Sequence, residues 1–250
     1  ARGRDLRLDV LRGFCVLAMI VNHISGGSPL HLLTGGDRFF TSAAAGFIVI
    51  SGFTAGMVYR RLIERDGLVP AMLKGWRRAW SLYLLTVGLT FFLVPISEFF
   101  NVPWASGLDL SRSLKFVLSV LTLHQTYTLV NILVLYTLLF AALPAALLLL
   151  AQGYGRGLLA ASWLLWLVYQ FYPDIATVPW TVTGGYLFAF SAWQVLFFTP
   201  LVLTYQWGCI PDPAPATLCR LHLLTGLATA ALIGYYALFN LPAGWLPGPL

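Results

Sequence analysis

Residues 129–150 read LVNILVLYTLLFAALPAALLLL and contain no charged side chain. About 20 apolar residues are enough for a helix to cross the hydrocarbon core of a bilayer. Further apolar stretches precede and follow this one, and several are shorter than a full crossing. They cover about 10–24, 43–59, 80–96, 158–171, 186–207 and 221–241. The pattern predicts an all-α, polytopic transmembrane helix bundle with about seven spans.

The composition supports membrane insertion. Of the 250 residues, 59% are hydrophobic and 10% are charged, and the mean hydropathy is +0.80. A soluble domain has roughly 25% charged residues, so lipid is the natural solvent for this chain. The net charge of +6 does not indicate nucleic-acid binding, because the basic residues cluster at the ends of the apolar stretches.

The distribution of Lys and Arg predicts the orientation. Most of them lie before the first span, between the second and third spans, or in later loops on the same side. The exceptions are Arg38, Arg112 and Lys115. The positive-inside rule therefore predicts a cytoplasmic N-terminus. The short apolar piece 114–123 is expected to lie in the interface or to re-enter the membrane, and loops 97–111 and 172–185 are expected outside the cytoplasm.

Arg12 and His23 form the first candidate site. Eleven helical steps bring both side chains to one face, roughly 16 Å apart along the axis. Polar groups in a membrane helix usually line a bundle interior or a wet cavity, and histidine moves protons near neutral pH. Asp9 is three residues before Arg12 and can pair with it. We therefore expect His23, Arg12 and Asp9 in a catalytic site, with Asn22 binding substrate; the alternative is a snorkelling Arg12 and an interfacial His23.

Lys74, Arg77 and Arg78 form a second group, at the expected cytoplasmic start of the third span. Their charges suit an anion such as the phosphates of coenzyme A. The alternative is an orientation signal or a contact with anionic lipid.

Two further groups of residues could contact substrate. Ser51 lies in a run of small residues, Ser51-Gly52 and Ala55-Gly56, which close helix packing also explains. His124, Trp193 and Gln194 place polar groups beside aromatic residues, where they could bind a sugar or acyl group or join helices by hydrogen bonds. No spacing of His, Cys, Asp or Glu predicts a metal site.

Several motifs carry a family resemblance. Residues 4–13, RDLRLDVLRG, followed by Asn22-His23, resemble the opening of the acyltransferase-3 superfamily, in which an Arg, ten residues and a His mark the first helix. A closer resemblance is to the OpgC family, whose members modify osmoregulated periplasmic glucans. Further stretches similar to that family follow in the same order, at 47–59, 77–83, 133–144 and 188–198.

The resemblance implies a single integral membrane acyltransferase domain over residues 1–250, cut short at its C-terminus, from a bundle of about ten helices in the bacterial inner membrane. It implies transfer of an acyl group from acyl-coenzyme A, as succinyl-CoA or acetyl-CoA, to a hydroxyl of a glycan acceptor. His23 would match the essential histidine and Arg12 the motif arginine, with Arg77 or Arg78 near the donor. Many relatives carry an acidic residue shortly before the FxxxSG run, where this chain has alanines and a glycine at 43–46.

Two other functions fit the same residues. A proton-coupled transporter or flippase could use His23 and Arg12, and inverted repeats or broken helices would favour it. A non-catalytic membrane scaffold would tolerate replacement of both side chains.

Overall fold

The computed structural model describes residues 6–23, 30, 42–100, 113–174, 177–182, 188–207 and 215–240. These form the long helices α1 (Leu6–His23), α3 (Ala43–Asp66), α4 (Leu68–Phe99), α6 (Asn131–Ala151), α7 (Gly155–Phe171), α8 (Phe190–Trp207) and α9 (Pro215–Asn240). The short helices are α5 (Ser113–Leu121) and the 3₁₀ turn η3 (Thr128–Val130). The described part of the chain contains no β-strand, so the all-α prediction is confirmed.

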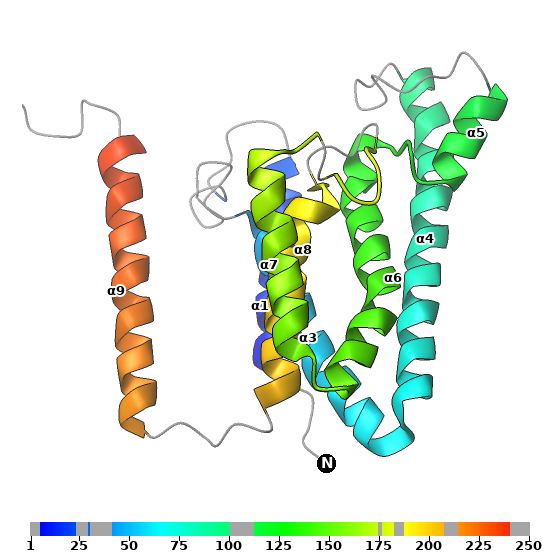
Figure 1. Ribbon diagram of the computed structural model, residues 1–250. Helices are drawn as coiled ribbons and strands as arrows, with labels where there is room; N and C mark the ends of the chain where they lie inside the picture. The colour runs from blue at the N-terminus through cyan, green and yellow to red at the C-terminus, as the bar shows by residue number, and fades with distance from the viewer. Residues whose placement is uncertain are drawn as a thin grey trace, which may run out of the picture.

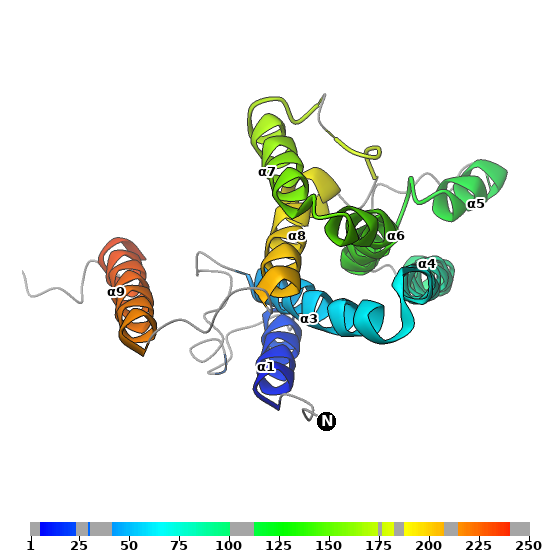
Figure 2. The ribbon, with the colours of Figure 1, turned by 60° about the horizontal axis from the view of Figure 1, so that its bottom comes forward.

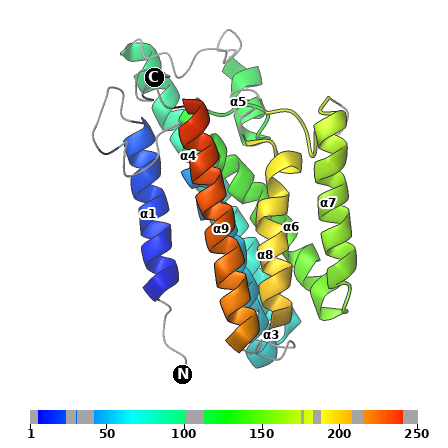
Figure 3. The same ribbon diagram turned by 90° about the vertical axis from the view of Figure 1, so that its left-hand side faces the viewer.

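Successive long helices run up and down the bundle (Figure 1). We call the end where α3 meets α4 and α6 meets α7 the lower end, as drawn there, and the opposite end the upper end. Figure 2 shows α3 between α1 and α8, with α7 beyond α8 and with α6 next to α4. The helix α9 stands apart from the others in these two views. Figure 3 shows the axes of α1, α7, α8 and α9 roughly parallel, with α8 running in the direction opposite to the other three.

The core lies between α3, α6 and α8. Ile48, Leu139, Leu143, Phe197 and Leu201 are completely buried there. In lipid, close van der Waals packing rather than the hydrophobic effect holds such helices together.

The exterior is apolar. Leu84, Phe92 and Leu164 are among the large apolar side chains that the bundle exposes, as expected of a protein surrounded by lipid. Among the described residues, three helical segments are long and apolar enough to cross a membrane, namely Ala43–Asp66, Leu68–Phe99 and Thr128–Ala151. The described chain is thus an all-α membrane bundle. Each predicted apolar stretch overlaps a helix, but the predicted count of seven spans is not confirmed.

The connection between α3 and α4 differs from the prediction. The sequence suggested a long basic segment before a third span near residue 80, whereas α4 begins at Leu68. Gly67 alone separates the two helices. Its φ is 89°, a backbone conformation that residues other than glycine rarely adopt. Pro70 falls in the first turn of α4, where a missing N–H has no helical partner to lose. As a result, Lys74, Arg77 and Arg78 lie on a helix.

Small residues bring α3 and α8 together. The sequence offered such close helix packing as the alternative explanation of the run of small residues from Ser51 to Gly56. A Cβ added to Gly52 would collide with the backbone of Phe197, and one added to Gly56 would collide with the backbone at Leu201. The absence of a side chain at these two glycines therefore allows the short distance between the helices.

Candidate functional site

Arg12 points from α1 toward α3. Its Nη2 donates a hydrogen bond of 3.0 Å to Oγ1 of Thr54, whose own hydroxyl donates to the carbonyl of Ile50 at 2.7 Å. Its Nη1 lies 3.8 Å from the carboxylate of Asp9, so the predicted pairing of these residues on one helix turn is confirmed. The guanidinium therefore faces a neighbouring helix.

Ser51 lies on the side of α3 that faces α6. Its hydroxyl donates to the carbonyl of Phe47 at 2.8 Å and lies 3.1 Å from the hydroxyl of Tyr136. Because the single Ser51 proton is used on Phe47, the Tyr136 hydroxyl donates to Ser51. Arg12 is close enough to Tyr136 to act on it electrostatically.

Arg12, Ser51, Thr54 and Tyr136 thus gather polar groups from three helices, and we call them the polar cluster. The sequence suggested the first two of these residues but not Thr54 or Tyr136. The signal for Tyr136 was a phenolic hydroxyl, next to that of Thr137, in the otherwise apolar run LVLYTLLF. The partner of Thr54 depended on how α1 packs on α3.

The three predicted anion-binding residues lie together. An open hollow of about 350 Å³ at the lower end is lined by Lys74, Arg77 and Arg78 with Tyr59, Ser81 and Phe140. We call this the cationic hollow. No acidic side chain lines it, and Arg78 acts electrostatically on Tyr59. Three cations around one concave surface can bind an anionic group such as a phosphate.

Aromatic side chains join the hollow to the polar cluster. Phe140, in the wall of the hollow, stacks on Tyr136 one helical turn away, with ring centroids 6.5 Å apart. On α3, Tyr59 of the hollow and Ser51 of the cluster are eight residues apart, which is about 12 Å along the axis. The two sites therefore share the α3–α6 side of the bundle.

His23 is the last residue of α1 and lies exposed at the upper end. Its Nδ1 is 2.6 Å from the carbonyl oxygen of Met19. A carbonyl oxygen only accepts, so Nδ1 carries a proton and Nε2 of the neutral ring keeps its lone pair. Asn22, beside it, is half-buried and has an interaction of its own. The arrangement leaves Nε2 able to accept a proton from a bound group.

His23 and Arg12 do not meet in the described part of the structure. Their separation of roughly 16 Å along α1 puts His23 at the upper end and Arg12 among the interhelical contacts. The two side chains therefore cannot act on the same atom in this arrangement.

Gln194 links two helices. Its Nε2 donates to the Ser162 carbonyl at 2.7 Å, and its Oε1 accepts from the Ser162 hydroxyl at 2.5 Å. Both atoms of the amide are used between α7 and α8, and the residue is buried. The geometry favours the structural alternative and not the substrate-binding one.

Trp193 and His124 have aromatic neighbours. Trp193 packs on Phe188, with ring centroids 4.9 Å apart. His124 stacks nearly parallel on Trp180, also at 4.9 Å, and its Nδ1 is 2.9 Å from the Thr122 hydroxyl. Neither residue lies in the polar cluster or in the cationic hollow. Among the described residues, no group of three or more His, Cys, Asp or Glu side chains could hold a metal ion.

Comparison with known proteins adds one match. No curated protein and no solved structure matches the chain. The model of a protein family described as "OpgC protein" matches residues 4–246. This range includes α1 with Arg12 and His23, the cationic hollow and every other described helix. The membrane helices and this match over nearly the whole length show that the chain belongs to the OpgC family, a membership that implies a transferase.

Proposed function

We propose that the protein is a membrane O-acyltransferase that moves an acyl group from acyl-coenzyme A to a hydroxyl of a glycan. The observation that carries the proposal is the sharing of one side of the bundle by the cationic hollow and the polar cluster. An acyl-coenzyme A molecule has an anionic nucleotide end and a long thioester arm. The cationic hollow suits the anionic end, and in this proposal the thioester arm extends from the hollow along the α3–α6 side toward the polar cluster.

The orientation expected from the basic residues fits this route. Arg60, Arg61, Arg65 and Arg156 lie at the lower end of their helices, which is also the end with the cationic hollow. The positive-inside rule puts this end in the cytoplasm, where acyl-coenzyme A is made. The upper end, with His23, then faces the opposite compartment and its glycans.

The cationic hollow, the polar cluster and His23 have separate roles in the proposed mechanism. Lys74, Arg77 and Arg78 bind the donor phosphates, and Arg12 with Ser51 and Tyr136 positions the arm. Nε2 of His23 takes the proton from the acceptor hydroxyl, whose oxygen attacks the thioester carbonyl carbon. The carbon–sulfur bond breaks, an ester forms, and the coenzyme A thiolate leaves with the proton that His23 gives up. Succinyl is the favoured acyl group and acetyl is the alternative.

The transporter has less support than the enzyme. A transporter site is commonly built from helices broken near the middle of the membrane. The long helices of the described chain are continuous, including α4, α6 and α8, which contain Pro95, Pro144 and Pro200. Arg12, which a transporter would use to bind its cargo, is instead hydrogen-bonded to Thr54 within the protein.

Acyl transfer by the protein in membranes tests the proposal. Labelled succinyl- and acetyl-coenzyme A are supplied with an oligosaccharide acceptor, and the label on the glycan is measured. We expect His23→Ala to reduce transfer by about 10²–10⁴-fold, the usual contribution of a general base. The control is His222→Ala, which removes an exposed histidine of α9. No labelled glycan from either donor with well-folded wild type, or full activity of His23→Ala, would contradict the mechanism.

A further inference from the structure

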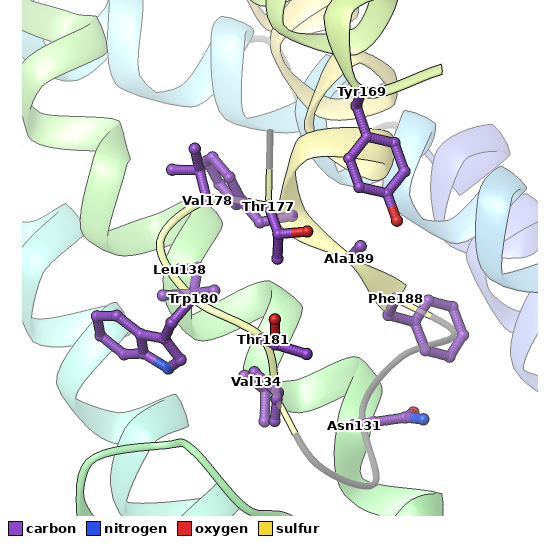
Figure 4. A pocket seen from close by; sticks show the side chains of 12 residues that line it. Asn131, Val134, Leu138, Tyr169, Thr177, Val178, Trp180, Thr181, Phe188 and Ala189 are labelled. Atoms are coloured by element: carbon purple, nitrogen blue, oxygen red, sulfur yellow. The ribbon is translucent and has the colours of Figure 1, made fainter. Parts of the chain in front are cut away.

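A second pocket lies at the upper end of the bundle (Figure 4). Its cavity of about 90 Å³ is several times the roughly 10–15 Å³ that one water molecule requires. The walls come from α6, the end of α7, the segment 177–182 and the start of α8. We call it the upper pocket. It shares no lining residue with the cationic hollow.

The upper pocket combines hydroxyl groups with aromatic rings. Tyr169, Thr177 and Thr181 carry hydroxyls, and Phe188 lies at its edge (Figure 4). The Thr177 hydroxyl donates to the Pro173 carbonyl at 2.6 Å and keeps its lone pairs for a ligand. In the described part of the structure, the hydroxyls of Tyr169 and Thr181 have no hydrogen-bond partner.

The upper pocket and the cationic hollow differ in charge. None of the residues that line the upper pocket is charged, whereas the cationic hollow has three cations. A pocket without a cation has nothing to neutralise a phosphate or a carboxylate, and burying either unpaired is costly. Hydroxyl groups and aromatic faces instead suit a neutral ligand with a hydroxylated rim and apolar C–H faces.

Hydrogen bonds hold the segment 177–182 to two other parts of the structure. The backbone N–H of Val178 donates to the Ser191 hydroxyl at 2.9 Å, and Nε1 of Trp180 donates to the Leu123 carbonyl at 3.1 Å. The Trp180 ring also stacks on His124. These contacts tie the segment to α8 and to the α5–α6 connection, so the walls of the pocket are held in place before a ligand binds.

We propose that the upper pocket binds a neutral pyranose ring, as a subsite for the acceptor glycan. This inference rests on the proposed function for the identity of the acceptor. Tyr169 and Thr181 hydrogen-bond the sugar hydroxyls, and Phe188 packs against its C–H face. The pocket lies at the same end of the bundle as His23, on other helices, so it holds a sugar unit other than the one that reacts.

Binding without any acyl donor tests the proposal. The protein is placed in lipid nanodiscs free of glycoside detergents, whose sugar head groups would compete, and titrated with short neutral gluco-oligosaccharides. Saturation-transfer NMR gives the dissociation constant. We expect Tyr169→Phe combined with Thr181→Val to weaken binding about tenfold or more, since each removes one hydrogen bond. Thr181→Trp, at an exposed position, is expected to abolish binding by filling the pocket.

The matched control is Tyr172→Phe, which removes an exposed hydroxyl one turn beyond Tyr169 and outside the pocket. We expect it to bind as the wild type does, and unchanged thermal unfolding of all variants excludes misfolding as the cause. An alkyl glucoside added to the nanodiscs is a second arm. Competition between the alkyl glucoside and the oligosaccharide supports a pyranose site. Tighter binding of the oligosaccharide indicates a soluble glycan as the ligand, and tighter binding of the alkyl glucoside indicates a glycolipid head group.

The outcomes separate this inference from the proposed function. Oligosaccharide binding that the pocket variants weaken supports the subsite even where no acyl transfer occurs. Transfer with unchanged binding and unchanged acceptor KM in those variants overturns the subsite and leaves the acyltransferase intact. A preference for sugar phosphates over neutral sugars also overturns it.

Discussion

Arg12 and Arg78 have the same charge but different surroundings. Arg12 is half-buried and bonded to Thr54, with Asp9 nearby, so its guanidinium is oriented by the protein. Arg78 is exposed in the wall of the cationic hollow and has no ion pair or hydrogen bond in the described part of the chain. At the scale of single residues, the guanidinium of Arg12 is held by the protein, whereas that of Arg78 is available to an anionic ligand.

Replacing Arg78 by Gln tests this distinction. A hydrogen bond to a charged group contributes about 1.5–3 kcal/mol, so we expect Arg78→Gln to raise the KM for acyl-coenzyme A by roughly 10–100-fold with kcat little changed. Initial rates with donors that have or lack the 3′-phosphate identify the group that is bound. If Arg78 binds the 3′-phosphate, Arg78→Gln and the wild type should have nearly the same KM for the donor that lacks this phosphate.

Arg61→Gln is the control, because Arg61 is an exposed arginine of α3 outside the hollow. An equal rise of KM in both variants would mean a general effect of surface charge and would remove Arg78 from the donor site.

At the scale of elements, α3 organises the site. Gly52 and Gly56 face α8, Ser51 faces α6, and Thr54 faces α1. At 100° per residue, Ser51 and Thr54 are roughly 60° apart, while the two glycines lie on another face. The close contact of α3 with α8 therefore turns the polar face of α3 toward Arg12 and Tyr136.

Gly56→Ala is expected to destabilise this contact. The added methyl group would collide with the α8 backbone, which cannot move aside as a flexible side chain can. We expect a loss of about 1–3 kcal/mol in the free energy of unfolding, seen as a lower Tm in nanodiscs. The matched variant is Gly88→Ala in α4, where a Cβ would meet nothing within 4 Å. It should be neutral or slightly stabilising, because alanine is the better helix former. Equal Tm values for the two variants would show that the α3–α8 contact tolerates a wider spacing.

At the scale of the whole molecule, the two ends of the bundle differ in chemistry. The lower end has the cationic hollow and a dense set of arginines, and the upper end has His23 and the uncharged upper pocket. An enzyme that takes an anionic donor from one compartment and a neutral acceptor from the other needs this polarity.

Labelling of single cysteines checks the orientation. Asp66 and Asp174 are exposed at the lower and upper ends, respectively. In a background without the native cysteines, we expect an impermeant maleimide to label Asp174→Cys in intact spheroplasts. Asp66→Cys should react only after the membrane is opened. The reverse pattern would contradict the cytoplasmic position of the lower end and the donor route proposed for it.

The sequence by itself determined the all-α membrane class, the approximate helix positions and the pairing of Asp9 with Arg12. These depend on local composition and on spacing along one helix, which a chain carries without its partners. Local spacing also placed Lys74, Arg77 and Arg78 near one another, although the start of α4 was missed. That boundary depends on the backbone conformation of Gly67, which the amino-acid type permits but does not require.

Only the tertiary structure decided which helices meet. The bonds of Arg12 to Thr54, of Tyr136 to Ser51 and of Gln194 to Ser162 join residues from different helices. The upper pocket likewise needs α6, α7, α8 and the segment 177–182 together. Helical periodicity gives the face on which a side chain lies but not the helix that packs against it. That choice comes from the packing of small and large residues between helices, as at Gly52 and Gly56.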